Sequence, residues 1–399
     1  MKFSLGLLAL PSLVSGTVYF KESFNDDSYE KTWTQPASWK PKGDMGAWQR
    51  TEGQWHGGDT SLQTSENARF YGFSAPLTTP VDNDGKDLVV QYTVKHEQRL
   101  DCGGAYIKLL RGGDKFDADK FGGDSEYGIM FGPDICGSAT RRTHVIFTYK
   151  GENKLIEKDV RCETDQLSHL YTLHLKSDNT FDVLIDNKSV RSGSLEDEFK
   201  FLEPKEIEDP AQSKPDDWVD ERRIPDPDDE KPEGYDDVPA EIPDPEASKP
   251  EDWDNEDDGE WEAPMVKNPD YKGAWKPKMI DNPDYKGPWE HPKIANPEYV
   301  ADPKLYQFCG GDNKCTHVGF ELWQVTAGTS FDDIIVTDSI AEAQAFAEET
   351  FFKKQDKEKK LYDDVQEKER EEAQRKADEE AMKAKAKADE EEDLSHDEF

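Results

Sequence analysis

The chain of 399 residues is 34% hydrophobic and 35% charged, a balance that excludes a single packed core running through all of it. Its formal net charge of −38 argues against nucleic-acid binding, because phosphates are neutralised by clustered Lys and Arg. We therefore expect extended or solvated segments, and cations or basic proteins as partners.

The two ends predict where the protein resides. Met1-Lys2 and the apolar run Phe3 to Val14 precede Ser15-Gly16-Thr17, which is typical of a signal peptide covering residues 1–16. The run is too short to span a bilayer and no later stretch is continuously apolar, so we expect no membrane span and an oxidising compartment. The ending His396-Asp397-Glu398-Phe399 differs by one residue from the His-Asp-Glu-Leu signal of a retrieval receptor, which predicts the endoplasmic reticulum lumen.

Residues 17–202 predict the first part of a mainly β, antiparallel sandwich. Runs such as 88–94, 144–149 and 171–175 are apolar or alternating, and turn signals such as Asn83-Asp84-Gly85 separate them. A second apolar set, Val318 to Thr337, predicts two closing strands within residues 303–340. We expect these strands to pair back into the same sandwich, which makes residues 203–302 an insertion.

The insertion contains most of the 24 prolines, and residues 201–300 carry 31 acidic against 12 basic side chains, a net charge of −19. One motif, Ile-x-Asp-Pro, recurs at Ile207, Ile224 and Ile242. A second motif then recurs with a strict period at Trp261, Trp275 and Trp289. Blocks of this kind predict a long hairpin arm in which each copy of the first motif lies beside a copy of the second, with small local cores of aromatic rings and Lys stems.

The hairpin turn falls at the acidic segment 255–260, which is either a docking site or a solvated turn without a partner. Beyond Ile340 the composition predicts a long charged helix with a disordered far end. Residues 341–399 hold 21 acidic and 12 basic side chains, a net charge of −9, so this tail is a mixed polyampholyte.

The five cysteines allow two bridges. Cys102 and Cys136 are favourably placed for a disulfide, and Cys309 and Cys315 could close a second, small loop. Cys162 is then left as a buried thiol. The absence of a Cys-x-x-Cys motif argues against a disulfide isomerase.

Between the first two cysteines, Tyr106, Lys108, Tyr127 and Asp134 combine aromatic faces with a cation and a carboxylate, at the two-residue spacing that presents side chains on one face of a strand. Sugars bind such sets, because pyranose faces pack on aromatic rings and charged groups hydrogen-bond the hydroxyls. The alternative is that these are ordinary surface residues. No catalytic motif is present, so we expect a binding protein and not an enzyme.

Two segments, Lys95 to Leu110 and Ile129 to Gly137, resemble the signature motifs of the calreticulin and calnexin family of lectin chaperones. With both repeat types the resemblance extends from Val18 to Thr337, and three copies of each repeat without a membrane span favour the calreticulin branch. The resemblance implies a legume-lectin-like sandwich that binds monoglucosylated high-mannose glycans on folding glycoproteins.

The resemblance also implies site residues. The sugar contacts would be Tyr106, Lys108, Tyr127, Met130, Asp134 and Glu321, with Trp323 supporting the same face. A calcium ion would be held by the Asp332 carboxylate and backbone oxygens near Ser23, Gly58 and Thr60. The arm tip at Glu256, Asp258, Glu260 and Trp261 would recruit a thiol oxidoreductase of the disulfide-isomerase family and a prolyl isomerase.

Three features depart from the family pattern. Calreticulins usually have Asp where Glu321 stands, and the Cys309 and Cys315 pair is not part of their usual pattern. The bases interleaved in the tail should weaken bulk calcium storage. We expect a monomer, and the alternative functions are a luminal calcium buffer whose sugar site has decayed and a chaperone that binds polypeptides without glycans.

Overall fold

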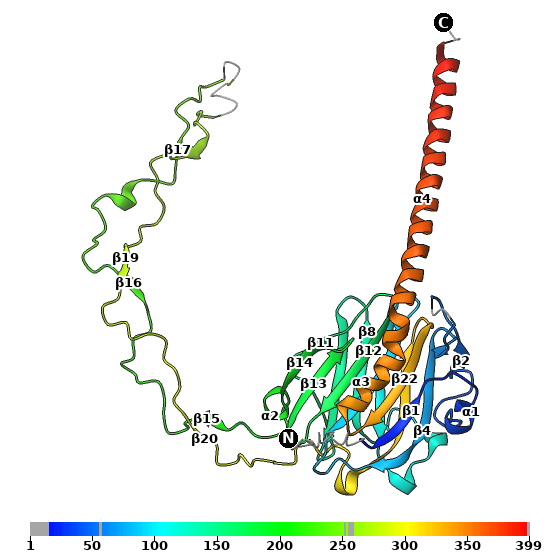
Figure 1. Cartoon of the computed structure of the whole chain (residues 1–399). Helices are drawn as coiled ribbons and strands as arrows, with labels where there is room; N and C mark the ends of the chain where they lie inside the picture. The colour runs from blue at the N-terminus through cyan, green and yellow to red at the C-terminus, as the bar shows by residue number, and fades with distance from the viewer. Residues whose placement is uncertain (1–15, 56–57, 251–252, 254–258, 397–399) are drawn as a thin grey trace, which may run out of the picture. The chain divides into compact units, whose positions relative to one another are not determined.

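The computed structural model describes residues 16–55, 58–250, 253 and 259–396, and for residues 386–396 it describes the backbone only. Two compact units are present: Met1–Glu203 with Val300–Phe399, here called the globular unit, and Pro204–Tyr299, here called the arm (Figure 1). The predicted signal peptide lies outside the described residues except for Gly16, as do the last three residues of the predicted retrieval signal.

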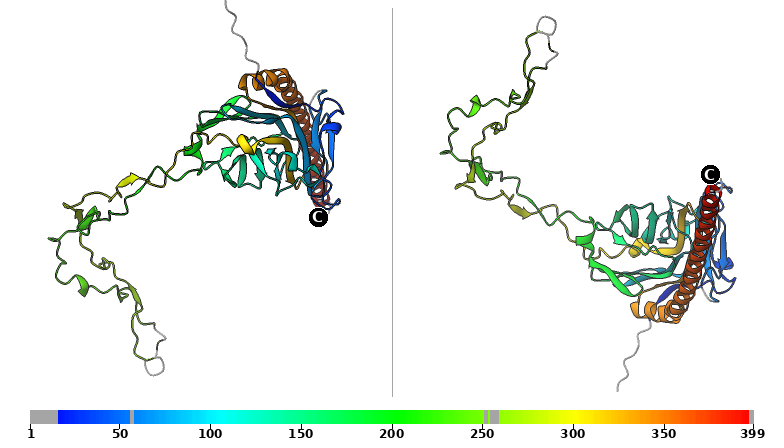
Figure 2. Two further views of the ribbon diagram at one scale, coloured as in Figure 1. Left: turned by 90° about the horizontal axis from the view of Figure 1, so that it is seen from below. Right: turned by 90° about the horizontal axis from the view of Figure 1, so that it is seen from above.

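Two antiparallel sheets form the globular unit. Among the described residues the first, sheet A, consists of β1 (Val18–Glu22), β2 (Trp48–Thr51), β3 (Ser61–Thr64), β5 (Leu88–His96), β12 (Ser168–Leu175), β13 (Thr180–Ile185), β14 (Lys188–Ser194) and β22 (Thr329–Thr337). The second, sheet B, consists of β4 (Arg69–Val81), β6 (Cys102–Gly104), β7 (Ile107–Leu110), β8 (Tyr127–Cys136), β9 (Thr140–Tyr149), β10 (Glu152–Leu155), β11 (Val160–Arg161) and β21 (Cys315–Gln324). Figure 2 shows the sheets as stacked layers.

The predicted closing strands pair back into the sandwich, one in each sheet. Strand β21 lies antiparallel to β4, β6 and β7, and β22 lies antiparallel to β1, β3 and β5. The core between the sheets is built from the inward side chains of each strand, for example Phe320 on β21 and Phe331 on β22, whose ring centroids are 4.4 Å apart. The fold class predicted from the sequence is therefore confirmed.

Two helices, α3 (Ile340–Glu349) and α4 (Phe351–His396), cover the outer face of sheet A with their adjoining ends (Figure 1). This cover explains why β5 is buried along its whole length. Its even-numbered residues Val90, Tyr92 and Val94 enter the core, whereas Val89 packs against α3.

Polar residues on the covered face find partners in the helices. The Gln91 amide donates to the backbone carbonyl of Ala343 at 2.9 Å, and the Lys95 ammonium lies 2.8 Å from the Glu358 carboxylate. We expected the far end of the tail to be disordered, but the helix α4 continues to His396. Ala, Lys and Glu favour helix, and ion pairs such as that between Lys359 and Asp363 support it. No helix in the described part of the chain is both long and apolar enough to cross a membrane.

The arm pairs its repeats as predicted, each first-type motif beside a second-type motif. Its short ladders join β15 (Glu206–Glu208) to β20 (Lys293–Ala295), β16 (Arg223–Pro225) to β19 (Met279–Asp281) and β17 (Glu241–Pro243) to β18 (Met265–Lys267). Aromatic rings and Lys stems meet beside the ladders, as where the Lys286 ammonium lies 5.8 Å from the Trp218 ring and the Trp218 indole donates to the Gly287 carbonyl at 2.9 Å.

The remaining short helices lie in connecting segments. They are α1 (Tyr29–Thr32), η1 (Gly113–Lys115), η2 (Ala118–Lys120), α2 (Leu195–Glu198), η3 (Tyr235–Asp237) and η4 (Gly311–Asn313). The structure joins Cys102 to Cys136 and Cys309 to Cys315, and Cys162 is a buried free thiol. Burial raises the pKa of the Cys162 thiol to about 12, so this residue is an unreactive part of the core.

One buried residue of β5 predicts acid sensitivity. Burial lowers the pKa of His96 from 6.5 to about 4, so the unfolded chain takes up this proton at a higher pH than the folded chain. Stability from His96 is therefore complete above pH 6.5 and is lost as the pH falls from there towards 4. The free energy of unfolding should be larger at pH 7 than at pH 5. In urea unfolding monitored by fluorescence, His96→Gln should reduce this difference by about 2 kcal/mol. His291→Gln, at a half-buried ring of the arm, should leave that difference unchanged, and an unchanged difference in His96→Gln would contradict the assignment.

Candidate functional site

An ion pair on the outer face of sheet B forms the centre of the candidate site. On β7, Ile107 and Leu109 enter the core, so Lys108 between them faces outward. The same alternation on β21 turns Glu321 outward, between the core residues Phe320 and Leu322. The Lys108 ammonium lies 2.7 Å from the Glu321 carboxylate, and the two side chains are only 4% and 15% exposed.

A β-bulge brings Tyr127 to this face. Tyr127 and Asp134 are seven residues apart, so an unbroken strand would direct them to opposite faces, and the two-residue spacing holds only for Tyr106 and Lys108. The ladder between β7 and β8 shifts register at Gly128, where Leu109 pairs with Ile129 but Leu110 pairs with Tyr127. Tyr127 consequently packs with Met130 in an outer apolar cluster that also contains Leu110, Phe121 and Ile146.

The two tyrosines flank the ion pair. The Lys108 ammonium lies 5.0 Å from the Tyr127 ring centroid and 6.0 Å from that of Tyr106. Burial, and then the nearby Glu321 carboxylate, raise the pKa of both hydroxyls above their ordinary value. Both hydroxyls therefore stay protonated at neutral pH and can donate hydrogen bonds.

Asp134 belongs to the same face through a residue that the sequence analysis missed. His144 on β9 pairs in register with Gly132; its imidazole lies 3.1 Å from the Asp134 carboxylate, and its ring centroid is 5.7 Å from that of Tyr106. The sequence could have indicated His144, because the alternation of its strand predicts that its side chain faces outward. Trp323, two residues beyond Glu321, is 38% exposed and packs on Phe70 with ring centroids 4.6 Å apart.

A cavity of about 780 Å³ borders the cluster without enclosing its ion pair. It shares Tyr127 with the candidate site and extends past Thr148 and Asn153 to Asn313, in the loop closed by the Cys309–Cys315 disulfide. This disulfide packs on β8, because a Cβ added to Gly128 would lie 2.9 Å from Cys315 Sγ and 3.0 Å from Cys309 Sγ. The bridge thus supports the bulge that carries Tyr127.

A second candidate site lies on sheet A, at a bulge in β22. Phe331 and Ile334 enter the core, and an unbroken strand would turn Asp333 into the core as well. The register of β22 against β5 shifts between Asp332 and Ile335, and Asp333 adopts a left-handed φ of 50°. Both carboxylates therefore face α4.

The Lys354 ammonium of α4 lies where these carboxylates converge. It is 3.0 Å from the Asp332 carboxylate and 2.9 Å from that of Asp333, and it also contacts Asp59. Asp59 stands between Gly58 and Thr60, and Ser23 lies near enough to Asp333 to lower the pKa of its carboxyl in part, so the residues predicted to bind calcium gather around one position. Asp59, Asp333 and Lys354 were missed; the first two are neighbours of predicted residues, whereas no sequence signal links Lys354 to them.

The chemistry of this cluster fits a calcium ion. Burial, and then the neighbouring Asp333 carboxylate, raise the pKa of Asp332 well above its ordinary value. Three carboxylates also surround the single Lys354 ammonium, which leaves an excess of negative charge. Among the described residues, one buried carboxylate oxygen of Asp333, Oδ1, has no hydrogen-bond partner. Hard oxygen atoms of this kind are the ligands that calcium prefers.

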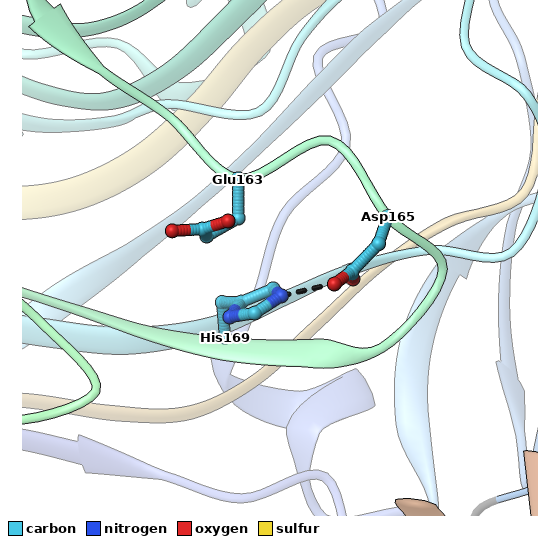
Figure 3. A group of neighbouring side chains, drawn as sticks. All are labelled: Glu163, Asp165 and His169. Carbon is cyan, nitrogen blue, oxygen red and sulfur yellow. Dashed lines mark hydrogen bonds and ion pairs between the residues drawn. The ribbon is translucent and has the colours of Figure 1, made fainter.

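A third cluster, Glu163, Asp165 and His169, has the residue types of a metal site (Figure 3). Its imidazole already engages two carboxylates, Asp165 at Nε2 and Asp186 at Nδ1, each at 2.9 Å. Burial opposes the charge, but these hydrogen bonds outweigh it and raise the pKa of His169 to about 10. The imidazole is therefore protonated at neutral pH and donates to both carboxylates, so the cluster is an ion-pair network.

The predicted arm tip is described in part. Glu256 and Asp258 lie outside the described residues, whereas Glu260 is exposed and Trp261 is half-buried. The indole of the nearby Trp253 donates to the Gly259 carbonyl at 2.9 Å.

Comparison with known proteins decides the family. The sequence profile of the Calreticulin family matches residues 20–258 and 256–336. The chain belongs to the calreticulin family.

Relatives from distant organisms share most of the chain. It is 54% identical over 364 residues to calreticulin of Chlamydomonas reinhardtii, covering 90% of this chain and 85% of the relative. Calreticulin of Caenorhabditis elegans is also 54% identical over 364 residues, covering 90% of this chain and 89% of the relative. Among solved structures, the Trypanosoma cruzi calreticulin globular domain aligns with a TM-score of 0.62 and 29% identity, covering 88% of this chain and 99% of that chain.

The buried ion pair makes a stability prediction for this calreticulin-family sandwich. Lys108→Met leaves Glu321 without its countercharge and should lower the free energy of unfolding by about 3 kcal/mol. Lys120→Met, at the exposed pair with Asp117, should cause no measurable change. The double variant Lys108→Met with Glu321→Met should recover part of the loss in urea unfolding. If the Lys108 and Lys120 variants lost equal amounts of unfolding free energy, the buried pair would contribute no more to stability than the exposed one.

Proposed function

We propose that this chain is a lectin chaperone that binds the terminal glucose of monoglucosylated high-mannose glycans on folding glycoproteins and catalyses no reaction. The observation that carries the proposal is the outward Lys108–Glu321 ion pair flanked by Tyr106 and Tyr127. Membership of the calreticulin family supports it, because this family implies a lectin chaperone role.

The residues of this face match the two surfaces of a pyranose. The rings of Tyr106 and Tyr127 and the side chain of Met130 supply apolar area for the C–H face of the sugar. Lys108 and the tyrosine hydroxyls donate hydrogen bonds, and Glu321 and Asp134 accept them from sugar hydroxyls. The ion pair fixes donor and acceptor side by side before the ligand arrives, which reduces the entropy cost of binding. The adjoining cavity gives room for the mannose residues that follow the glucose.

Calcium is the proposed ligand of the cluster on β22. Asp332 would hold the ion together with backbone oxygens near Ser23, Gly58 and Thr60, and the bound ion would supply the positive charge that joins three separate segments of sheet A. The buried carboxylates and the unpartnered oxygen of Asp333 support this assignment. The ion lies on sheet A and the sugar site on sheet B, so its proposed role in glycan binding is to stabilise the sandwich.

We also propose a location and protein partners, from the two ends of the sequence and from the family assignment. The signal-peptide pattern and the terminal His396-Asp397-Glu398-Phe399 favour the endoplasmic reticulum lumen, with return by a retrieval receptor. The acidic arm tip that includes Glu260 and Trp261 is the proposed docking site for a thiol oxidoreductase of the disulfide-isomerase family and for a prolyl isomerase. We infer that one copy of the chain performs this function as a monomer.

Glycan titration tests the lectin proposal. In calorimetry, the full chain should bind a glucose-capped high-mannose oligosaccharide and discriminate strongly against the uncapped form. Tyr106→Ala should weaken binding at least tenfold, because it removes both ring area and a hydroxyl donor. Tyr285→Ala, an exposed ring of the arm, should leave affinity unchanged. Equal binding of capped and uncapped glycans, or full affinity in Tyr106→Ala, would contradict the proposal.

Calcium counting separates the lectin from a bulk calcium buffer. A chain that ends at Asp364 keeps the α4 residues that contact sheet A and its loops, including Tyr362, whose ring centroid lies 4.9 Å from that of Trp55. Because the removed tail mixes acidic and basic side chains, flow dialysis should detect nearly the same amount of weakly bound calcium in both chains. Loss of most weak sites on truncation would favour the buffer function.

A further inference from the structure

One cation of this chain lies in the calcium cluster. Lys354 is half-buried, and its ammonium contacts the carboxylates of Asp59, Asp332 and Asp333, which come from two distant segments. The side chains of Asp332 and Asp333 are only 3% and 1% exposed, so water cannot compensate their charge. The ammonium is the compensating charge.

The single positive charge of Lys354 neutralises only part of the negative charge of this cluster. Three carboxylates surround one positive charge, and one oxygen of Asp333 has no partner among the described residues. A divalent ion would neutralise more of the charge, and it could use the unpartnered oxygen as a ligand.

The cluster cannot hold both cations. The cavity between Asp332 and the α4 residues Lys354 and Glu358 has a volume of about 10 Å³, which is no more than the room for one water molecule. A calcium ion placed there would also repel the ammonium at short range in a poorly solvated site. Calcium can bind the carboxylates only after the Lys354 side chain has left them.

We propose that Lys354 is a tethered cation that occupies the calcium position of the calcium-free protein, and that calcium binds to Asp59, Asp332 and Asp333 by displacing it. This inference rests on the proposed calcium function and extends it in two ways. It adds Asp59 and Asp333 to the ligand set, and it makes the contact between α4 and sheet A respond to calcium.

The displacement should be local because α4 has a second anchor. One turn beyond Lys354, the Glu358 carboxylate lies 2.8 Å from Lys95 and accepts hydrogen bonds from the backbone N–H and the hydroxyl of Ser168. Phe351 packs on Leu170 in the same interface. These contacts do not involve the calcium ligands, so the helix stays on sheet A while the Lys354 side chain moves out.

Calcium binding by the full chain tests the inference. Lys354→Met keeps the aliphatic stem and removes the competing charge, so calorimetry at micromolar calcium should show at least tenfold tighter binding. The calcium-free melting temperature of this variant should fall, because its buried carboxylates lose their countercharge, and added calcium should raise it more than in the unsubstituted chain. The matched control Lys353→Met removes the neighbouring exposed ammonium and should change neither value.

Hydrogen exchange gives a readout that needs no variant. In the unsubstituted chain, calcium should increase amide exchange only in the turn around Lys354, which loses its ion pairs, while residues of β22 become more protected. If Lys354→Met and the unsubstituted chain bind calcium with equal affinity, or if calcium does not change amide exchange in α4, calcium does not displace Lys354. The proposed calcium site itself is not contradicted by that result. If neither chain binds calcium at micromolar concentration, the proposed calcium function itself fails.

Discussion

The antiparallel pairing of β21 and β22 with strands that precede the arm is the constraint on which both candidate sites depend. Each closing strand completes a different sheet, and each carries one carboxylate that its site needs: Glu321 on sheet B and Asp332 on sheet A. The arm can be inserted because the sandwich closes behind it. The contacts are non-local, so neither site exists until the chain on both sides of the arm has folded together.

Two β-bulges then shape the two candidate sites on otherwise regular strands. In a regular strand, neighbouring side chains face opposite sides of the sheet, which limits how many functional groups can share one face. The bulge at Gly128 adds Tyr127 to the outer face of sheet B, and the bulge at Asp333 turns a second carboxylate away from the core of the sandwich. At both positions a polar group gains a charged neighbour instead of an apolar one.

Much of this could be predicted from the sequence, because its patterns are local or periodic. The apolar alternation of the strands, the turn signals and the two repeat types predicted the sandwich, the closing strands and the pairing of the arm. The proposed set of sugar-contact residues followed from family motifs. His144, Lys354 and the two bulges could not be predicted in this way, because they depend on register between strands and on which face of α4 meets sheet A. Register is set by packing over the whole sheet, and a single sequence records it only indirectly.

A crystal structure of the full chain with a glucose-capped mannose oligosaccharide would test the central claim most directly, namely that the Lys108–Glu321 pair between two tyrosines is the sugar site. The account predicts the glucose ring on this pair, with its hydroxyls hydrogen-bonded to Lys108 and Glu321 and its apolar face against Tyr106 or Tyr127, and the mannose residues extending towards the adjoining cavity. A glycan bound elsewhere on the chain, with no sugar in contact with this ion pair, would contradict it.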